Sequence, residues 1–458
     1  MKRFLNYKTL LVLLLLTVGL FLRLNNLESK TLFDADQEWL AFRAKDVLSG
    51  DIVLLGPVTS VGNFSIGPGF IYLWSFFAFL THGNPISGVY LSVSLGILTC
   101  LSIFLFAKYF IGEKVAYILL FLVSISFSFI FWDQIPWAPS LFYLSQIILL
   151  AGAYLSIKND LGYLFLSVGF IVGFQSHFGI FLSLLPILIY FIFIRPKKPS
   201  LKILLMSFGI LFIGLLPNIT FDVFNNFINL KRFILIFKGD GLDYFTSLGK
   251  IIKTLAYNVS SIVYPRQINL LDSIISKGFL ALLLVSGIRL LLNNKERNLS
   301  LLLLFTITIP AVFFYVQQGK FSEYYLMMTV PPLILLLGLF IKQILKRKFL
   351  IITVLIISLF LNLISLKNQK RLYNLSAKNK ITRIIIEKGG KEGYGISLTT
   401  KLGDAFGFKY IFDYLKIKSD VPPKKGETKI FSVIVPAGFD GIKVYKEIDG
   451  IGLIWQGI

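Results

Sequence analysis

Long apolar runs alternate with short, mostly basic loops along most of the chain. A helix needs about 17–25 mainly apolar residues to cross a bilayer. Runs of this kind predict eleven membrane-spanning helices, at 9–25, 86–107, 115–132, 140–157, 161–176, 178–194, 201–219, 277–292, 299–316, 324–341 and 349–366. The chain is therefore predicted to be an α-helical, multi-pass membrane protein.

One further apolar run, 66–80, is predicted not to cross. It begins with Gly67-Pro68-Gly69, which suits the start of a helix better than its middle. If this run does not cross, the short basic loops all lie on the cytoplasmic side, as the positive-inside rule requires. These loops are 1–8, 108–114, Lys158, 195–202, 289–297 and 342–348. We therefore expect an interfacial or re-entrant helix at 66–80, a cytoplasmic N-terminus and an extracytoplasmic C-terminus in the plasma membrane.

Three segments are then predicted to lie outside the cytoplasm. Two are long loops of the membrane domain 1–366, at 26–85 and 220–276. The third is 367–458, which is charged and contains strand-like runs such as Ile430–Val435. We expect this third segment to be a small extracytoplasmic α/β domain.

The end of that segment carries a hairpin signal. Asp449-Gly450 separates the runs Ile442–Ile448 and Ile451–Trp455. Asp-Gly suits the two-residue turn that joins antiparallel strands. These two runs are therefore predicted to pair.

Composition agrees with a membrane protein and excludes several site types. The chain is 55% hydrophobic and 15% charged. Its net charge of +22 comes from bases clustered between apolar runs, which indicates contact with membrane lipid rather than nucleic acid. A single cysteine, Cys100, excludes a disulfide framework, and the two histidines, His82 and His177, exclude a His-rich metal site.

The most polar stretch near the first span is Phe33–Asp51. Asp34 with Gln37 fits a capping box, and Gly50 fits a helix end. The predicted helix has an apolar stripe of Leu40, Ala44, Val47 and Leu48, with Glu38 and Lys45 opposite. We expect an amphipathic helix that lies in the membrane interface.

Three carboxylates lie at the start of this helix. Asp34 is interpreted as its cap, and Glu38 as a solvated first-turn acid that complements the helix dipole. Asp36 has the same structural interpretation, but it lies where a lipid-linked substrate would present its head group. Asp36 is therefore the first candidate for a catalytic base.

The order of several motifs resembles the GT-C membrane glycosyltransferases, particularly glycosyltransferase family 39, with its protein O-mannosyltransferases and the aminoarabinose transferase acting on lipid A. The similarity covers about residues 1–366. The matching stretches are Phe33–Gln37, Leu48–Asp51, Leu55–Ser60, Gly67-Pro68 with Tyr72-Leu73, Trp137–Ser140, Gln175–Phe178, Tyr324–Leu326 and Pro331-Pro332.

The resemblance implies a GT-C fold with juxtamembrane helices in the first external loop. It also implies transfer of a hexose or pentose from a polyprenyl-phosphate donor to an extracytoplasmic protein, lipid or envelope glycan. An acid just after the first span serves as the base in this family, which places that role on Asp36. Many relatives carry an adjacent Asp-Glu pair, whereas Ala35 separates two aspartates here, so Asp34 is the second choice. The helix N-terminus is expected to keep the carboxylate ionised.

Further site residues follow from this mechanism. A phosphate leaving group requires cations, for which the candidates are Lys320, Arg266 and Arg43. The substrate cavity is expected to include Glu38, Asp133, His177 and Tyr324. A divalent cation that bridges Asp36 and phosphate is neither predicted nor excluded, because the sequence shows no dedicated ligand set.

Other functions remain as alternatives. A transporter or flippase of a lipid-linked saccharide would show charges buried in mid-span or broken helices in paired halves. Neither is evident in the sequence. A structural envelope protein would use 367–458 to bind a partner, and an oligosaccharyltransferase is the nearest rival among enzymes.

Overall fold

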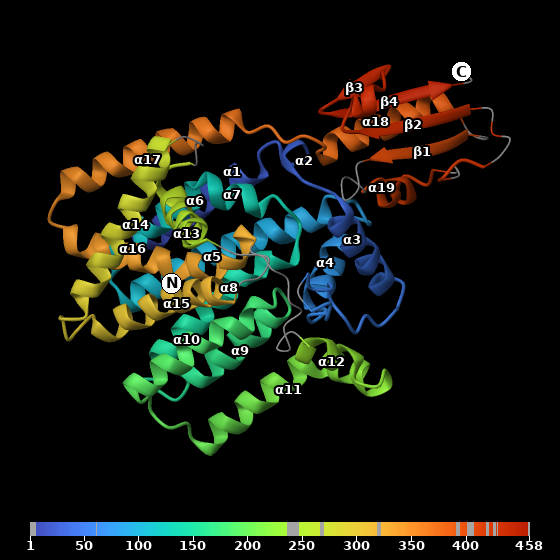
Figure 1. The fold of residues 1–458 in the computed structure, drawn as a ribbon. Coiled ribbons are helices and arrows are strands. Elements are labelled where there is room, and N and C mark those ends of the chain that lie inside the picture. Colours follow the sequence, from blue (N-terminus) through green and yellow to red (C-terminus); the bar gives the residue numbers. More distant parts are fainter. Residues whose placement is uncertain are drawn as a thin grey trace, which may run out of the picture.

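The computed structural model describes residues 6–60, 62–235, 247–265, 270–317, 322–390, 394–400, 407–417, 421–424, 427 and 429–456. Over these residues, a bundle of apolar helices is joined at one end to a small mixed α/β domain (Figure 1). The bundle helices are α1 (Tyr7–Leu24), α5 (Ser87–Phe110), α6 (Glu113–Ile125), α7 (Phe127–Asp133), α8 (Phe142–Leu155), α9 (Gly162–Phe174), α10 (Gly179–Ile194), α11 (Leu201–Phe224), α13 (Leu248–Val263), α14 (Leu270–Leu290), α15 (Arg297–Val316), α16 (Val330–Ile344) and α17 (Lys348–Asn368), with the 3-10 segments η1 (Ala138–Leu141) and η3 (Glu323–Thr329).

The described helices confirm a multi-pass membrane protein. Eight are long and apolar enough to cross a bilayer, counting η1 with α8 and η3 with α16, and the bent pair α6–α7 makes a ninth. The apolar helices α9 and α10 are shorter. Each of the eleven predicted spans falls on one of these helices or bent pairs.

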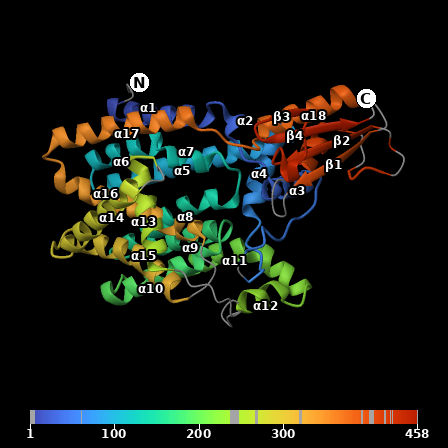
Figure 2. The ribbon, with the colours of Figure 1, turned by 45° about the horizontal axis from the view of Figure 1, so that its top comes forward.

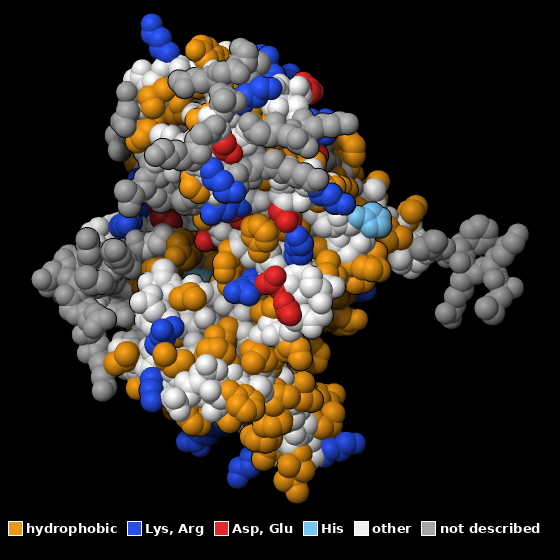
Figure 3. Space-filling view, turned by 90° about the vertical axis from the view of Figure 1, so that its right-hand side faces the viewer, with side chains coloured by type: hydrophobic (Ala, Val, Ile, Leu, Met, Phe, Trp, Pro, Cys, Tyr) orange, Lys and Arg blue, Asp and Glu red, His pale blue; other side chains and the backbone are white. Residues whose placement is uncertain are grey.

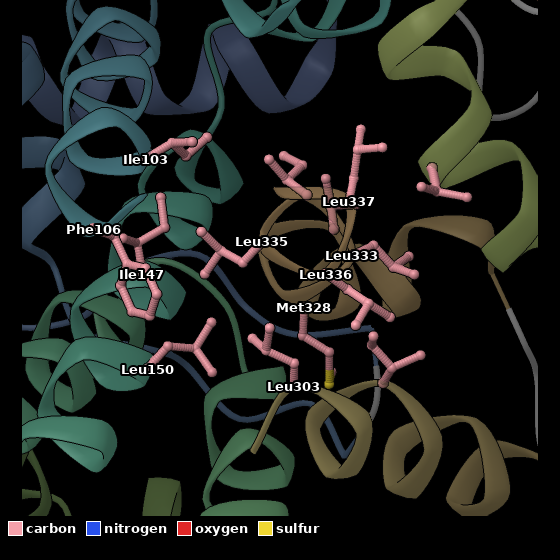
Figure 4. Packing of buried hydrophobic residues seen from close by; sticks show 14 of the residues in the cluster. Ile103, Phe106, Ile147, Leu150, Leu303, Met328, Leu333, Leu335, Leu336 and Leu337 are labelled. Atoms are coloured by element: carbon pink, nitrogen blue, oxygen red, sulfur yellow. The ribbon is translucent and has the colours of Figure 1, made fainter. Parts of the chain in front are cut away.

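Helix α16 forms the centre of the bundle. Its residues Leu333, Leu335, Leu336 and Leu337 are almost fully buried. They face apolar side chains of α5, α8 and α15 (Figure 4). Close packing on all sides explains why this span is apolar around its whole circumference.

Helix α13 was missed by the sequence prediction, which placed 220–276 in one external loop. Its buried face includes Ile251, Leu255 and Val259, which lie in the same core as α16. Apolar residues four apart form one face of a helix. The pattern escaped detection because polar residues such as Lys250 and Lys253 on the other face interrupt the apolar run.

The span α6–α7 is broken at Ser126, where the chain bends by 57°. A break frees backbone groups that the helix would otherwise satisfy. The Arg23 guanidinium donates to the freed carbonyls of Ser124 and Val123, at 3.1 Å and 3.4 Å. The Asn362 side chain accepts from the Phe127 N–H at 2.7 Å. Side chains of α1 and α17 therefore stabilise the break.

Arg23 also forms a buried ion pair. Its Nε donates to Asp133 Oδ2 at 2.7 Å, and the Arg23 side chain is fully buried. Both residues lie at the ends of their helices, α1 and α7, rather than in mid-span.

The α/β domain comprises α18 (Leu375–Gly389), β1 (Tyr394–Thr400), α19 (Phe408–Tyr414), β2 (Lys429–Val435), η4 (Phe439–Gly441), β3 (Lys446–Ile448) and β4 (Ile451–Gln456). The sheet order is β1-β2-β4-β3, with β1 parallel to β2 and the other neighbours antiparallel. The predicted hairpin is confirmed: β3 pairs with β4 around Asp449 and Gly450, both at positive φ.

Short helices surround the junction of the two parts. They are α2 (Leu27–Lys30), α3 (Ala35–Leu48), α4 (Gly69–Leu80) and α12 (Ile228–Leu235). Figures 1 and 2 both place α3, α4, α12 and the α/β domain at the same end of the bundle, while α1 begins at the opposite end. At 12 residues, α4 spans about 18 Å, which is shorter than a bilayer core of about 30 Å. The non-crossing role of 66–80 and the orientation of the termini stay predictions.

The Arg23–Asp133 pair generates the first testable prediction. Arg23→Met leaves Asp133 buried without its counter-charge, so we expect the free energy of unfolding in detergent to fall by about 3 kcal/mol. The double variant Arg23→Met/Asp133→Leu removes both charges and is expected to recover most of that loss. Lys8→Met serves as the control, because Lys8 is also a base of α1 that pairs with an acid of the bent span, Glu113 on α6, but at the surface. An equal loss in Lys8→Met, or no recovery in the double variant, would contradict the role of the buried pair.

Candidate active site

The start of α3 has the local structure that the sequence predicted. Asp34 is the N-cap residue, and its N–H donates to the Gln37 side chain at 2.9 Å, as in a capping box. The helix ends at Leu48, followed by Gly50 at a φ of +98°. Capping fixes the direction in which the first turn presents Asp34 and Asp36.

The buried face of α3 differs from the predicted stripe. Leu40, Ala41 and Ala44 are buried, but Leu48 is 44% exposed. Glu38 is buried instead of solvated, because its Oε1 accepts from the backbone N–H of Tyr410 in α19 at 3.1 Å. The prediction of a solvated Glu38 is therefore wrong. The contact that covers this face comes from the α/β domain, about 370 positions further along the chain, and no local sequence pattern indicates it.

Two basic residues of the segment after the last span act on Asp34. Its Oδ1 accepts from Lys378 Nζ at 2.9 Å. Arg371 also lies within electrostatic reach of Asp34. Asp34 is therefore both a helix cap and an ion-pair partner, which leaves Asp36 as the better candidate for proton transfer.

Asp36 lies open to solvent at the start of α3, although many protein atoms surround it. This partial burial raises the pKa of the Asp36 carboxyl, and the negative charge of Asp34 raises it further. The ionised state predicted for this carboxylate at neutral pH stays a prediction, because only the direction of the shift is resolved. A raised pKa makes a carboxylate a stronger base, so the shift favours proton abstraction.

A cluster of hydroxyl groups lies close to Asp36. Tyr324 is within electrostatic reach of Asp36. The Ser60 hydroxyl lies 3.3 Å from that of Tyr324 and 3.1 Å from that of Tyr325. The first polar loop, 26–85, and η3 therefore meet beside the acids, and this contact places Tyr324 in the candidate site.

Aromatic rings continue from Tyr324 in two directions. Trp137 lies 6.4 Å from Tyr324 between ring centroids, and Trp132 stacks on Trp137 at 5.3 Å. On the other side, the His177 ring lies 5.9 Å from Tyr324. Phe131, 5.5 Å from Trp132, completes the row. We call these five residues the aromatic row.

His177, in the loop between α9 and α10, is a neutral member of this row. Burial lowers the pKa of His177 to about 4, so its imidazole carries no charge at neutral pH. Its Nδ1 accepts from the Gly179 N–H at 3.0 Å, which assigns the proton to Nε2. His177 can therefore donate one hydrogen bond but cannot stabilise an anion by charge.

Arg371 lies at the Phe131 end of the row. Its guanidinium is 4.2 Å above the Phe131 ring, and Nη2 donates to the Phe131 carbonyl at 3.3 Å. Among the described residues, the buried Nη1 group has no hydrogen-bond partner. Burial lowers the pKa of Arg371 to about 10, against the effect of nearby Asp34, so the guanidinium stays charged at neutral pH. A buried cation with a donor to spare fits an anionic ligand.

The structure distributes the other predicted residues differently. Arg43 pairs with Asp46 at 3.0 Å and lies over Trp39 on the partly exposed side of α3. Asp133 is buried against Arg23 rather than open to a sugar hydroxyl. Lys320 and Arg266 lie outside the described residues. Over the part of the chain that the structure describes, no three His, Cys, Asp or Glu side chains gather into a metal-binding group.

Sequence reasoning missed Arg371, Lys378 and Tyr325. The two basic residues follow the last span in a segment rich in Lys and Arg, where sequence alone cannot distinguish one base from another. They lie beside the site because segments that are far apart in the sequence meet there. Lys378 and Asp34, for example, are 344 positions apart. Tyr325 had a signal in the matched Tyr324–Leu326 motif, but only Tyr324 was chosen.

A separate apolar cavity of about 270 Å³ lies between α9, α11, α12 and the first polar loop. Its few polar residues have structural partners. Asp222 accepts from the N–H groups of Asn229 and Leu230, and Asn229 binds the backbone of Ser65. This cavity lacks acids free for catalysis among its described lining residues.

Comparison with known proteins identifies the fold. No family model and no curated protein matches this sequence. ArnT from Cupriavidus metallidurans bound to undecaprenyl phosphate aligns over 97% of each chain, with a TM-score of 0.62 and 12% identity. The same protein in the apo state gives 0.61 and 12% over 98% of each chain. The apo oligosaccharyltransferase of Archaeoglobus fulgidus gives 0.50 and 11%, over 95% of this chain and 66% of that one.

At this level of identity the likeness concerns the fold. It extends over the bundle and the α/β domain together, since nearly the whole of both chains aligns with ArnT. The resemblance predicted from the motifs is confirmed at that level. This chain is a multi-pass membrane protein with the GT-C fold.

Proposed function

We propose that this chain is a glycosyltransferase that moves a sugar from a polyprenyl-phosphate donor to an acceptor outside the cytoplasm. The observation that carries the proposal is the position of Asp36. It is open at the start of α3 and within electrostatic reach of Tyr324, and its neighbour Asp34 is within electrostatic reach of Arg371. The fold supports the donor class, because the structural neighbour ArnT is bound to undecaprenyl phosphate.

Asp36 acts as the base in this mechanism. The acceptor hydroxyl transfers its proton to the Asp36 carboxylate while its oxygen attacks the anomeric carbon of the sugar. The bond from that carbon to the phosphate oxygen breaks, and the electron pair leaves with the phosphate. Asp34 does not compete for the proton, because Lys378 holds its carboxylate. The raised pKa of Asp36 increases its basicity.

Arg371 neutralises the phosphate. The leaving group gains negative charge as the bond breaks, and a fixed cation in a water-poor site stabilises that charge. Arg371 is charged and partly buried, and its unpartnered Nη1 can donate to a phosphate oxygen. It takes the role that the sequence assigned to Lys320, Arg266 and Arg43.

The aromatic row holds the sugar. Binding sites for small ligands combine apolar ring surfaces with a few polar groups that fix orientation. Trp132 and Trp137 supply flat surfaces, and the hydroxyls of Tyr324 and Ser60 supply hydrogen bonds. The sugar would then lie between the acceptor at Asp36 and the phosphate at Arg371.

Asp36→Asn tests the base directly. The amide cannot accept the proton, so we expect the transfer rate to fall by about 100-fold to 10,000-fold. The assay uses purified protein with radiolabelled polyprenyl-phosphate hexoses and pentoses and with envelope acceptors. Asp46→Asn is the matched control, because Asp46 lies on the same helix and pairs with Arg43. Undiminished transfer by Asp36→Asn would exclude Asp36 as the base, and saccharide movement without transfer would favour a transporter.

The pH dependence follows from the sign of the shift. The folded pKa of Asp36 is raised, so the active carboxylate form is lost at a higher pH than for an ordinary aspartate. We expect kcat/KM to decline as pH falls through this raised pKa. The decline is measured with the donor and acceptor far below saturation. Activity that stays constant down to the ordinary pKa of aspartate, 3.8, would contradict this expectation.

Arg371→Gln tests the phosphate site. Loss of a charge-assisted hydrogen bond costs roughly 1.5–3 kcal/mol, which corresponds to about a 10-fold to 100-fold loss in kcat/KM for the donor. Arg371→Lys is expected to recover part of this loss by restoring the charge. Lys370→Gln is the control, since Lys370 is the exposed neighbour. Equal donor kinetics in Arg371→Gln and Lys370→Gln would remove Arg371 from the site.

The proposed reaction also requires a defined orientation. The start of α3 and the α/β domain must face the extracytoplasmic side, since both lie at the same end of the bundle (Figures 1 and 2). A reporter fused after Ile458 is therefore expected to be active outside the cytoplasm. A cytoplasmic reporter would mean that 66–80 crosses the membrane after all.

A further inference from the structure

We infer that the α/β domain positions the base of the site, and that Lys378 is the positioning residue through which it acts. Lys378 fixes the chain at Phe33 and Asp34, and it balances the carboxylate next to Asp36. The inference rests on the proposed function, which makes Asp36 the catalytic base. The contact between the two parts does not depend on that function.

The membrane bundle and the α/β domain contact each other through their backbones. Leu32 forms an antiparallel bridge with Asn374, and the Leu375 N–H donates to the Thr31 carbonyl at 3.0 Å. The segment before α3 and the segment before α18 therefore run side by side. This pairing places the first turn of α18 directly beside the N-cap of α3.

Lys378 uses that position. Its Nζ donates to the Phe33 carbonyl at 2.5 Å and to Asp34 Oδ1 at 2.9 Å, and its side chain is fully buried. A buried ammonium is costly unless it is paired and hydrogen-bonded. Both oxygens belong to the two residues that lead into α3. The contact therefore fixes the backbone and the cap at the point where the helix begins.

Helix α19 closes the same junction from a second direction. Gly407, at a φ of +107°, approaches the Phe33 carbonyl so closely that a Cβ atom would collide with it. Phe33 is fully buried, with the Tyr410 ring at 6.0 Å. The Tyr410 N–H binds Glu38, and Lys45 pairs with Asp413 at 2.5 Å. One face of α3 is thus held against the α/β domain along three turns.

Acidic and basic side chains gather in the middle of this end of the molecule (Figure 3). Among the described residues, Lys378 on α18 and Arg371 after α17 act electrostatically on Asp34, and Tyr324 on η3 acts on Asp36. Glu38 on α3 lies within electrostatic reach of Lys378. Among these, Lys378 makes the direct contact with Asp34, so it controls how much negative charge Asp36 senses.

The electrostatic consequence has a definite sign. In Lys378→Met the charge of Asp34 is no longer balanced by the ammonium, so Asp36 retains its proton to a higher pH. We expect the acid limb of the pH–rate profile to move up by on the order of one pH unit. In Lys378→Met/Asp34→Asn both charges are absent, and the limb is expected to return to the wild-type position or below. Asparagine is also a good N-cap, so α3 keeps its start.

The experiment compares Lys378→Met, the double variant and the control Lys380→Met in the full-length protein in detergent. Lys380 is exposed on the same helix. The pH–rate profile is recorded together with hydrogen–deuterium exchange of the first turn of α3. We expect faster exchange in Lys378→Met and wild-type exchange in Lys380→Met. The double variant removes the whole ion pair, so the comparison stands even if Lys378→Met alone folds poorly.

The outcomes separate this inference from the proposed function. An acid limb that moves up in Lys378→Met and returns in the double variant supports positioning by Lys378. An unmoved limb in both variants, or unchanged exchange at α3, overturns it, even if activity falls. Faster exchange combined with full activity of Asp36→Asn would overturn the proposed base, while the attachment of α3 by Lys378 would stand.

Discussion

The buried pair of Arg23 and Asp133 is the interaction on which the site depends most. It fixes α7 at an angle of 57° to α6, and α7 carries Phe131 and Trp132. A continuous helix through Ser126 would direct these two rings elsewhere. Arg23 satisfies the carbonyls that the break frees, so the bend is a stable part of the fold. The position of the aromatic row therefore depends on a buried charge pair in the bundle.

The candidate site combines side chains whose own segments would not hold them in place. Asp36, the proposed base, lies on the first turn of a helix whose start is held by contacts with another part of the chain. Tyr324 lies in a 3-10 segment, and Arg371 in a connection between two helices. Each becomes useful because a neighbouring element holds it: the α/β domain holds α3, Ser60 contacts Tyr324, and Phe131 supports Arg371. The GT-C bundle supplies the rigid frame for these contacts.

Hydropathy alone predicted the spans, because the bilayer requires long apolar runs wherever the chain crosses. Local chemistry predicted the capping box at Asp34 and the Asp449-Gly450 turn, since both depend on neighbours within four residues. The prediction failed where a distant segment decides the environment. Glu38 was predicted to be a surface acid, but it is buried and accepts a hydrogen bond from Tyr410. Helix α13 was predicted to be part of a loop, but one of its faces is buried in the core. Nothing in the local sequence distinguishes Arg371 and Lys378 from neighbouring bases. Their interactions with Asp34 appear only in the folded structure.

The pairing of Leu32 with Asn374 has a consequence for biosynthesis. The residues that lead into α3 are made early, but their partners on α18 and α19 are made more than 300 positions later. The Asp449 side chain in turn accepts from Asn374, which joins the turn between β3 and β4 to the same junction. Closing so long a loop is entropically costly, so this contact forms late. A nascent chain can therefore insert its spans into the membrane while the helix that carries the proposed base still lacks support, and α3 is held in place only after the α/β domain has been made.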